Sequence, residues 1–196
     1  MGRGATSAIA SYALAGAAHL VTGLDHVLFL IGLLLLVKRA RALFFAVTAF
    51  TVAHSLSLAL QVLGAVRLPP APVEAAIALS VLFVARELLR PPDRRTLAQR
   101  RPYVVTFAFG LLHGLGFAGG LAAMEVPRAE VPAALFGFNI GLEAAQIGLV
   151  LVALAVGRAL GPAFVRLPAW TRRAPAYSLG AAAAFWLFSR TAAFLS

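Results

Sequence analysis

The sequence contains no cysteine and few charged side chains. Without cysteine, thiolate metal ligands, thiol redox chemistry and disulfide cross-links are all excluded. Only 12% of the 196 residues are charged, which is about half the share found in ordinary soluble domains. Lysine is nearly absent, because Lys38 is the only one. These shortages exclude a soluble cytosolic domain, a disordered chain and a disulfide-stapled secreted module.

Apolar residues dominate what remains. They make up 61% of the chain, and the mean hydropathy is +0.90. A helix that crosses a bilayer needs about 20 mostly apolar residues, and six stretches meet this requirement with short connections between them. They cover residues 10–37, 41–66, 73–89, 103–124, 132–157 and 175–194. We therefore expect an all-α polytopic membrane helix bundle of about six transmembrane helices, with residues 1–196 forming a single integral membrane domain in the lipid bilayer.

The net charge of +10 would indicate nucleic acid binding in a soluble protein. Here the basic residues lie between the apolar stretches, where they orient a membrane protein and meet anionic lipid headgroups, so no nucleic acid partner is expected. With the N-terminus outside, only four of the 17 basic residues face outward: Arg3, Arg67, Arg128 and Arg190. The positive-inside rule therefore predicts that both termini lie outside. Glu87, close to Arg86 and Arg90, is expected to be a solvated interfacial residue.

The first apolar stretch is longer than a bilayer requires, and it carries Thr22 and Gly23 in its middle. It is either one kinked helix or a half-helix followed by a span, and a split at Gly23 would raise the helix count to seven. A signal peptide ending near Ala15 is a rival interpretation, although the residues before Ala15 are poor in leucine.

Polar residues within these stretches are the main functional signal. All four histidines and three of the seven acids lie within or at the edge of apolar stretches: His19, Asp25, His26, His54, Glu74, His113 and Glu143. Five of them fall near the midpoints of four different stretches, whereas His19 and Glu74 lie nearer the outer surface. Ionised groups at such depth cost several kcal/mol each unless they are paired or hydrated. The sequence therefore predicts one shared polar site at the midplane that opens outward.

Imidazole and carboxylate groups without thiolate are suitable ligands for divalent Zn, Ni, Co, Mn or Fe. All seven residues are therefore candidate metal ligands, and Asn139 and Arg190 are candidates for groups that support the ligands. His19 and His26 would stand ~10 Å apart along a straight helix, so one ion binds both only if the helix breaks at Gly23. Each polar residue alone is also explained by a hydrogen bond between neighbouring helices.

These residues belong to five strings with a characteristic order and spacing. The strings are HLVTGLDHVLFLIGLLLL (19–36), FTVAHSLSLAL (50–60), VEAAIALS (73–80), FGLLHGLGFA (109–118) and FNIGLEAAQIG (138–148). Together they resemble the HupE/UreJ family of hydrogenase and urease accessory membrane proteins, over about residues 16–190. Better-known members carry a His-Pro-type motif in the first helix, whereas Leu20 follows His19 here. The chain therefore resembles a divergent branch.

The resemblance implies a secondary permease for nickel or cobalt in a bacterial-type inner membrane. It carries metal-ligand roles onto His19, Asp25 and His26, and further onto the matching positions in the other strings: His54, Glu74, His113 and Glu143.

Two functions of different kinds fit these residues. In a divalent-cation permease, the outer acids and His19 would capture the ion and the deeper residues would carry it across, although the inner halves of the stretches hold few polar residues. In an intramembrane zinc-type hydrolase with an outward-opening site, Glu74 or Glu143 would act as general base. A purely structural metal site is a third alternative. The identity of the ion and the oligomeric state, including a homo-oligomer, stay open.

Overall fold

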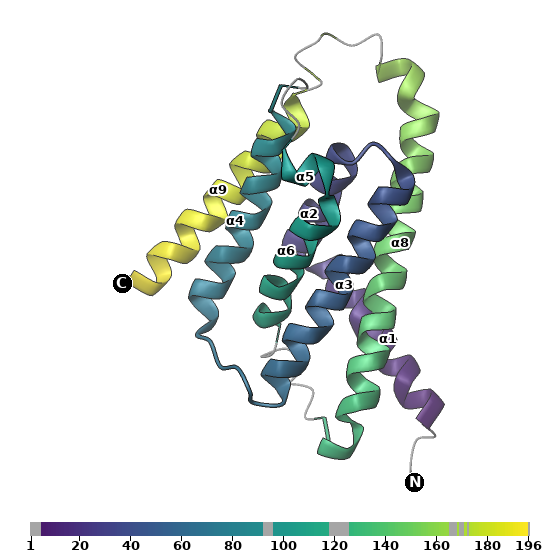
Figure 1. The fold of residues 1–196 in the computed structure, drawn as a ribbon, viewed down its shortest axis with the longest axis vertical. Coiled ribbons are helices and arrows are strands. Elements are labelled where there is room, and N and C mark those ends of the chain that lie inside the picture. Colours follow the sequence, from purple (N-terminus) through teal and green to yellow (C-terminus); the bar gives the residue numbers. More distant parts are fainter. Residues whose placement is uncertain are drawn as a thin grey trace.

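Helices make up the described fold (Figure 1). The structure is a computed structural model, and it describes residues 5–91, 96–117, 126–164, 168, 171 and 173–195. The helices are α1 (Ala5–Thr22), α2 (Leu24–Leu36), α3 (Ala40–Val62), α4 (Pro70–Leu88), α5 (Leu97–Arg100), α6 (Pro102–Gly116), the 3₁₀ turn η1 (Arg128–Glu130), α8 (Val131–Phe164) and α9 (Ala174–Leu195). No strand occurs among the described residues, so the all-α prediction is confirmed.

The observed helix bounds agree with the predicted stretches to within three residues except in several places. The helix α1 begins at Ala5, five residues before the first stretch, and α3 ends at Val62, four residues before the end of the second. The helix α6 ends at Gly116, and residues 118–124 of the fourth stretch lie outside the described residues. The helix α8 continues to Phe164, past the predicted end. The short helix α5 was not predicted. It begins with a capping box in which Thr96 and Gln99 satisfy each other's backbone N–H groups.

The first apolar stretch forms two helices rather than one. Among the described residues, α1 and α2 meet at an angle of 73° with Gly23 between them. The Gly23 N–H still donates to the carbonyl of His19, at 2.9 Å, before the chain turns into α2. The helix α1 packs along α8, where Gly16 and Gly141 let the two backbones approach closely. The alternative of a helix broken at Gly23 is therefore confirmed.

The remaining helices pack as neighbours in pairs. The helix α3 lies against α6, α4 lies against α9, and α2 contacts both α4 and α9 (Figure 1). Phe29, Phe50, Val84 and Leu179 form an apolar core where α2, α3, α4 and α9 meet. This core fixes the position of α2, which carries Asp25 and His26 at its first turn.

The apolar helices confirm part of the predicted membrane topology. Two helical segments of the described chain, Ala40–Val62 and Arg128–Gly161, are long and apolar enough to cross a membrane, and the bent pair of α1 and α2 would make a third. The helix α6 is apolar but has only 15 residues. The count of six spans therefore stays a prediction.

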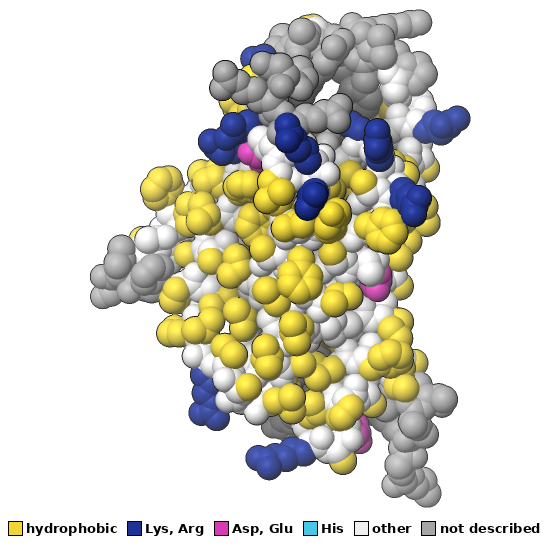
Figure 2. Space-filling view, viewed as in Figure 1, with side chains coloured by type: hydrophobic (Ala, Val, Ile, Leu, Met, Phe, Trp, Pro, Cys, Tyr) yellow, Lys and Arg dark blue, Asp and Glu magenta, His cyan; other side chains and the backbone are white. Residues whose placement is uncertain are grey.

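Charge divides the two ends of the bundle. Figure 2 shows a broad apolar surface with most of the basic side chains gathered at one end. This end, called the basic end below, lies where α2 ends and α3 begins. Its described basic residues are Lys38, Arg39, Arg41, Arg86, Arg90, Arg100, Arg101, Arg158 and Arg173. Fewer basic residues lie toward the opposite end, called the far end. This division fits the predicted orientation, which stays a prediction.

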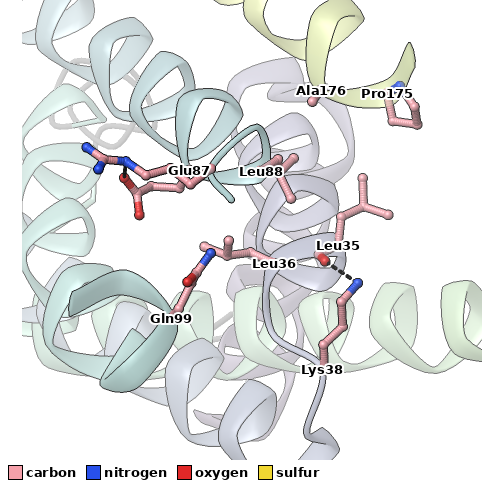
Figure 3. A pocket seen from close by; sticks show the side chains of 9 residues that line it. Leu35, Leu36, Lys38, Glu87, Leu88, Gln99, Pro175 and Ala176 are labelled. Carbon is pink, nitrogen blue, oxygen red and sulfur yellow. Dashed lines mark hydrogen bonds and ion pairs between the residues drawn. The ribbon is translucent and has the colours of Figure 1, made fainter. Parts of the chain in front are cut away.

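A pocket of about 270 Å³ opens at the basic end between α2, α4, α5 and α9 (Figure 3). Glu87 lies at its wall and is only 2% exposed. Its carboxylate accepts a hydrogen bond from Thr96 and lies 3.3 Å from Nε of Arg90 and 3.7 Å from Nη1 of Arg86. The expectation of a solvated Glu87 is therefore wrong, because these partners neutralise the carboxylate and allow its burial. No histidine lines this pocket.

Candidate functional site

Four histidine side chains from four helices meet inside the bundle. They come from α1, α2, α3 and α6, and His26 lies at their centre. Its ring centroid is 4.7 Å from that of His19, 4.7 Å from that of His113 and 5.9 Å from that of His54. The centroids of His19 and His54 are 6.0 Å apart. The structure therefore brings together four of the seven candidate ligands in one group, called the histidine cluster below.

The break at Gly23 is what places His19 beside His26. A Cβ atom at Gly23 would lie 2.8 Å from the carbonyl oxygen of His19 and 3.0 Å from Nδ1 of His26, so the chain turns tightly around this residue. On a straight helix the two rings would be ~10 Å apart along the axis. The condition that the sequence set for one shared ion is therefore met.

Two glycines let α6, which carries His113, pack closely against α3, which carries His54. Gly110 and Gly114 lie one turn apart on α6, and a Cβ on either would overlap the backbone of α3 at Phe50 or His54. Such small residues at a helix–helix contact let two backbones approach closely in a membrane. This contact places the imidazole of His113, from α6, within the cluster.

Aromatic side chains surround the imidazoles. The rings of Phe50 and Phe138 both stack on the His54 ring, with centroids 6.1 Å and 6.4 Å away. Phe117 packs on His19 at 3.8 Å, and Phe29 packs on His113 at 5.4 Å. His26, His54 and His113 are at most 4% exposed. These three histidines are therefore enclosed, whereas His19 is partly exposed, and every unsatisfied polar atom buried there is costly.

Hydrogen bonds define the tautomers of two of these histidines. The carboxylate of Asp25 accepts from Nδ1 of His26 at 3.0 Å, so the proton resides on Nδ1 and Nε2 carries a lone pair. The hydroxyl of Ser80 donates to the carbonyl of Ile77 at 2.6 Å and lies 3.0 Å from Nε2 of His113. Nε2 of His113 therefore donates to Ser80, and its Nδ1 carries the lone pair.

Those two lone pairs belong to a larger set of unpartnered nitrogens. Among the described residues, five buried imidazole nitrogens have no hydrogen-bond partner: Nε2 of His19, Nε2 of His26, Nδ1 and Nε2 of His54, and Nδ1 of His113. Each unpaired buried group of this kind costs about 1–3 kcal/mol. Their concentration in one cluster indicates that the cluster is built to receive a group that interacts with imidazole nitrogen.

The side chains of the cluster are not arranged as the ligands of a metal ion in this structure. No group of three or more His, Cys, Asp or Glu side chains among the described residues is arranged to hold an ion. Two imidazoles that bind one ion through bonds of ~2 Å have ring centroids roughly 5 Å apart. The observed separations of 4.7–6.0 Å are close to this value.

The carboxylate of Asp25 lies between the cluster and a charged group at its edge. Oδ2 of Asp25 lies 3.6 Å from Nη2 of Arg190 on α9. Nε of Arg190 also lies 3.7 Å from the carboxylate of Glu74, and its Nη1 donates to the backbone carbonyl of Glu74 at 2.9 Å. Asp25, Glu74 and Arg190 were all predicted site residues. The structure joins them in an ion-pair chain that begins at His26.

Glu143 lies elsewhere. Its carboxylate accepts a hydrogen bond from the hydroxyl of Thr48 on α3 at 2.6 Å, and no imidazole of the described residues pairs with it. The helix α8 passes the cluster at Phe138, so Glu143 lies five residues further toward the basic end. Asn139 bonds through its side-chain nitrogen to the carbonyl of Leu135, and its Oδ1 is buried without a partner.

The cluster lies nearer the far end of two of its helices. His113 is three residues from the end of α6 at Gly116, and His54 lies in the half of α3 nearer the far end. The predicted level of the site at the midplane of a membrane stays a prediction.

Sequence reasoning missed several polar partners. Ser80 fixes the tautomer of His113, and the hydroxyl of Thr51 donates to Oε1 of Gln146 at 2.8 Å. The available signal was spacing: Thr48, Thr51 and His54 recur every three residues on α3 and so lie close to one face.

The fold and the site together define a helical membrane-type protein with a buried histidine cluster beside an Asp–Arg–Glu chain. A family model described as HupE / UreJ protein matches residues 1–190, so the chain belongs to the HupE/UreJ family. Comparisons with curated proteins and with solved structures give no match.

Proposed function

We propose that the protein is a secondary permease for a divalent transition metal of the nickel or cobalt type, and that the histidine cluster binds the transported ion. The observation that carries this proposal is the set of five unpartnered imidazole nitrogens in one enclosed cluster. Neutral imidazole is a good ligand for Ni²⁺ and Co²⁺. Membership in the HupE/UreJ family, which is associated with nickel and cobalt transport, supports the same substrate class.

The charged edge of the cluster supports entry of a cation from the far end. Within the described part of the chain, Asp25 is the one carboxylate that pairs with an imidazole of the cluster, that of His26. Glu74 is about half exposed and lies one arginine away from Asp25. In the proposed orientation these acids face the outside, and the basic end faces the cytoplasm of a bacterial-type inner membrane.

Polar pairs between α3 and α8 support a route from the cluster toward the basic end. Thr51 and Gln146 form the first pair, one helical turn from His54, and Thr48 and Glu143 form the next. The sequence showed few polar residues in the inner halves of the stretches, but these four side chains line up across one helix interface. They offer oxygen ligands to an ion that leaves the imidazoles.

The hydrolase alternative has no support. A hydrolytic site needs a general base within reach of an ion-bound water, and the two candidates were Glu74 and Glu143. Glu74 pairs with Arg190, and Glu143 pairs with Thr48. Neither forms a hydrogen bond or ion pair with an imidazole in the described part of the chain.

The test is equilibrium binding of Ni²⁺ and Co²⁺ to the purified full chain in detergent, followed by uptake into vesicles. We expect saturable binding that falls at least ~10-fold in a His54→Ala/His113→Ala variant, because two of the four imidazole ligands are lost. The matched control is Thr106→Val, since Thr106 is also buried on α6 but bonds only to backbone carbonyls. Absence of binding by the unaltered protein, or full binding by the double variant, would overturn the proposal.

A further inference from the structure

Arg190 is held at the edge of the histidine cluster by three groups. Its guanidinium lies 3.6 Å from Oδ2 of Asp25, lies 3.7 Å from the carboxylate of Glu74 and donates to the backbone carbonyl of Glu74. The ring of Trp186, one turn earlier on α9, lies 5.6 Å from the guanidinium carbon. The side chain is about one quarter exposed. Arg190 is therefore a fixed positive charge at the rim, in contact with two acids.

Asp25 has two oxygen atoms with different partners. Oδ1 accepts hydrogen bonds from the backbone N–H and from Nδ1 of His26, at 2.9 Å and 3.0 Å. Oδ2 lies against Arg190. The charge of Asp25 is thus divided between the histidine at the centre of the cluster and a cation that belongs to the chain. An incoming cation that is attracted to Asp25 therefore finds its carboxylate already paired with the guanidinium of Arg190.

We propose that Arg190 competes with the transported cation for Asp25 and thereby determines the affinity and exchange of the site. This inference rests on the proposed function. When an ion binds the imidazoles next to Asp25, the guanidinium is repelled by it and loses its share of the carboxylate. Arg190 then remains on Glu74, whose carboxylate and backbone carbonyl both hold it. Glu74 is the alternative partner that lets Arg190 leave Asp25 without leaving the rim.

A competing Arg190 and a purely structural Arg190 predict opposite changes in ion affinity when the residue is replaced. If Arg190 only tied α9 to α2 and α4, its removal would loosen the site and weaken ion binding. If Arg190 competes for Asp25, removal of its charge strengthens ion binding. Glu74 should behave in the opposite way, because a neutral residue there leaves Asp25 as the only carboxylate for the guanidinium.

The experiment measures Co²⁺ binding to the full chain in detergent by visible absorption, which reports the ligand set of the ion as well as its affinity. We expect Arg190→Gln to bind Co²⁺ ~10-fold more tightly, since a like charge near the ion is removed. The glutamine keeps a donor for the Glu74 carbonyl. Arg190→Lys keeps the charge and should remain within ~3-fold of the unaltered protein. Glu74→Gln should bind several-fold more weakly.

A neighbouring substitution provides the control. Ser189→Ala removes a hydroxyl that bonds to the carbonyl of Trp186 on the same helix, and it should leave Co²⁺ affinity unchanged. Unchanged or weaker binding by Arg190→Gln would overturn the inference. Should that variant fail to fold, tighter or unchanged binding by Glu74→Gln would overturn it independently.

The two proposals fail differently. Loss of all Co²⁺ binding in the unaltered protein, or full binding in His54→Ala/His113→Ala, would overturn the proposed function itself. Normal binding that depends on the two histidines but does not rise in Arg190→Gln would overturn only the competition between Arg190 and the ion.

Discussion

Gly23→Ala is the sharpest test of how the site is built, because the added atom meets three groups of the site. Its Cβ would lie 2.8 Å from the carbonyl oxygen of His19, 3.0 Å from Nδ1 of His26 and 3.3 Å from Oδ1 of Asp25, whereas ordinary contacts begin at 3.4 Å. The backbone at Gly23, with φ −78° and ψ 90°, is accessible to alanine. The dihedral angles therefore allow alanine, but the 2.8 Å contact with the backbone oxygen of His19 requires the chain or the new side chain to shift.

The expected loss of ion affinity follows from the hydrogen bond between His26 and Asp25, which the substitution weakens. To clear the new Cβ, the His26 ring has to move a few tenths of an ångström, away from the carboxylate that fixes its tautomer. A hydrogen bond to a charged group contributes about 1.5–3 kcal/mol, so we expect ion affinity to fall ~10- to 100-fold. Alanine also favours helix by up to about 1 kcal/mol over glycine, which promotes a straighter chain and separates His19 from His26.

The assay compares Co²⁺ affinity with thermal unfolding in detergent. Gly148→Ala on α8 is the matched control, because a Cβ there meets no atom within 4 Å. We expect Gly23→Ala to lose affinity with little change in unfolding temperature, since the gain in helix preference offsets part of the clash. Equal affinities for Gly23→Ala and Gly148→Ala would refute the claim that the break at Gly23 assembles the site.

Three further predictions concern groups around the cluster. Gly114→Ala should destabilise the fold by about 1–3 kcal/mol, because its Cβ overlaps Ser57 and the His54 backbone; chemical unfolding measures this, and an unchanged stability would contradict the close α3–α6 contact. Ser80→Ala should cost about 1 kcal/mol by leaving Nε2 of His113 without its acceptor, and retained stability would show that this bond contributes nothing. Glu143→Gln should keep equilibrium ion binding but slow uptake into vesicles, and a loss of binding like that of the double histidine variant would return Glu143 to the cluster.

Much of the architecture could be predicted from composition. Long apolar stretches with short basic connections predicted an all-α membrane bundle, and most described residues of these stretches are helical, with Gly23 and residues 63–66 among the exceptions. For the overlong first stretch, the sequence was compatible with one kinked helix and with a half-helix followed by a span. The sequence could not choose between them, because a glycine inside an apolar helix is tolerated at modest cost. The packing of α1 along α8 and of α2 in the core sets the 73° bend.

The sequence predicted which residues belong to the site better than it predicted how they are arranged. The four histidines were grouped because buried ionisable groups on separate helices need partners, and the structure brings them together. Thr96 and Arg90 show why Glu87 was misplaced. Its neighbours along α4 predicted solvation, but Thr96, the residue before α5, bonds the carboxylate from nine residues away.

Glu143 shows the deeper reason why sequence position does not define a site. Rise along a helix is 1.5 Å per residue, so relative depth within one helix can be counted, but the offset between helices depends on where each helix ends. His113 lies three residues from the end of α6, and α8 meets the cluster at Phe138, which stacks on His54. Glu143 is then roughly 7.5 Å further along its axis, beside Thr48. On the proposed route this places Glu143 next after Thr51 and Gln146, so we expect it to receive an ion that leaves the cluster.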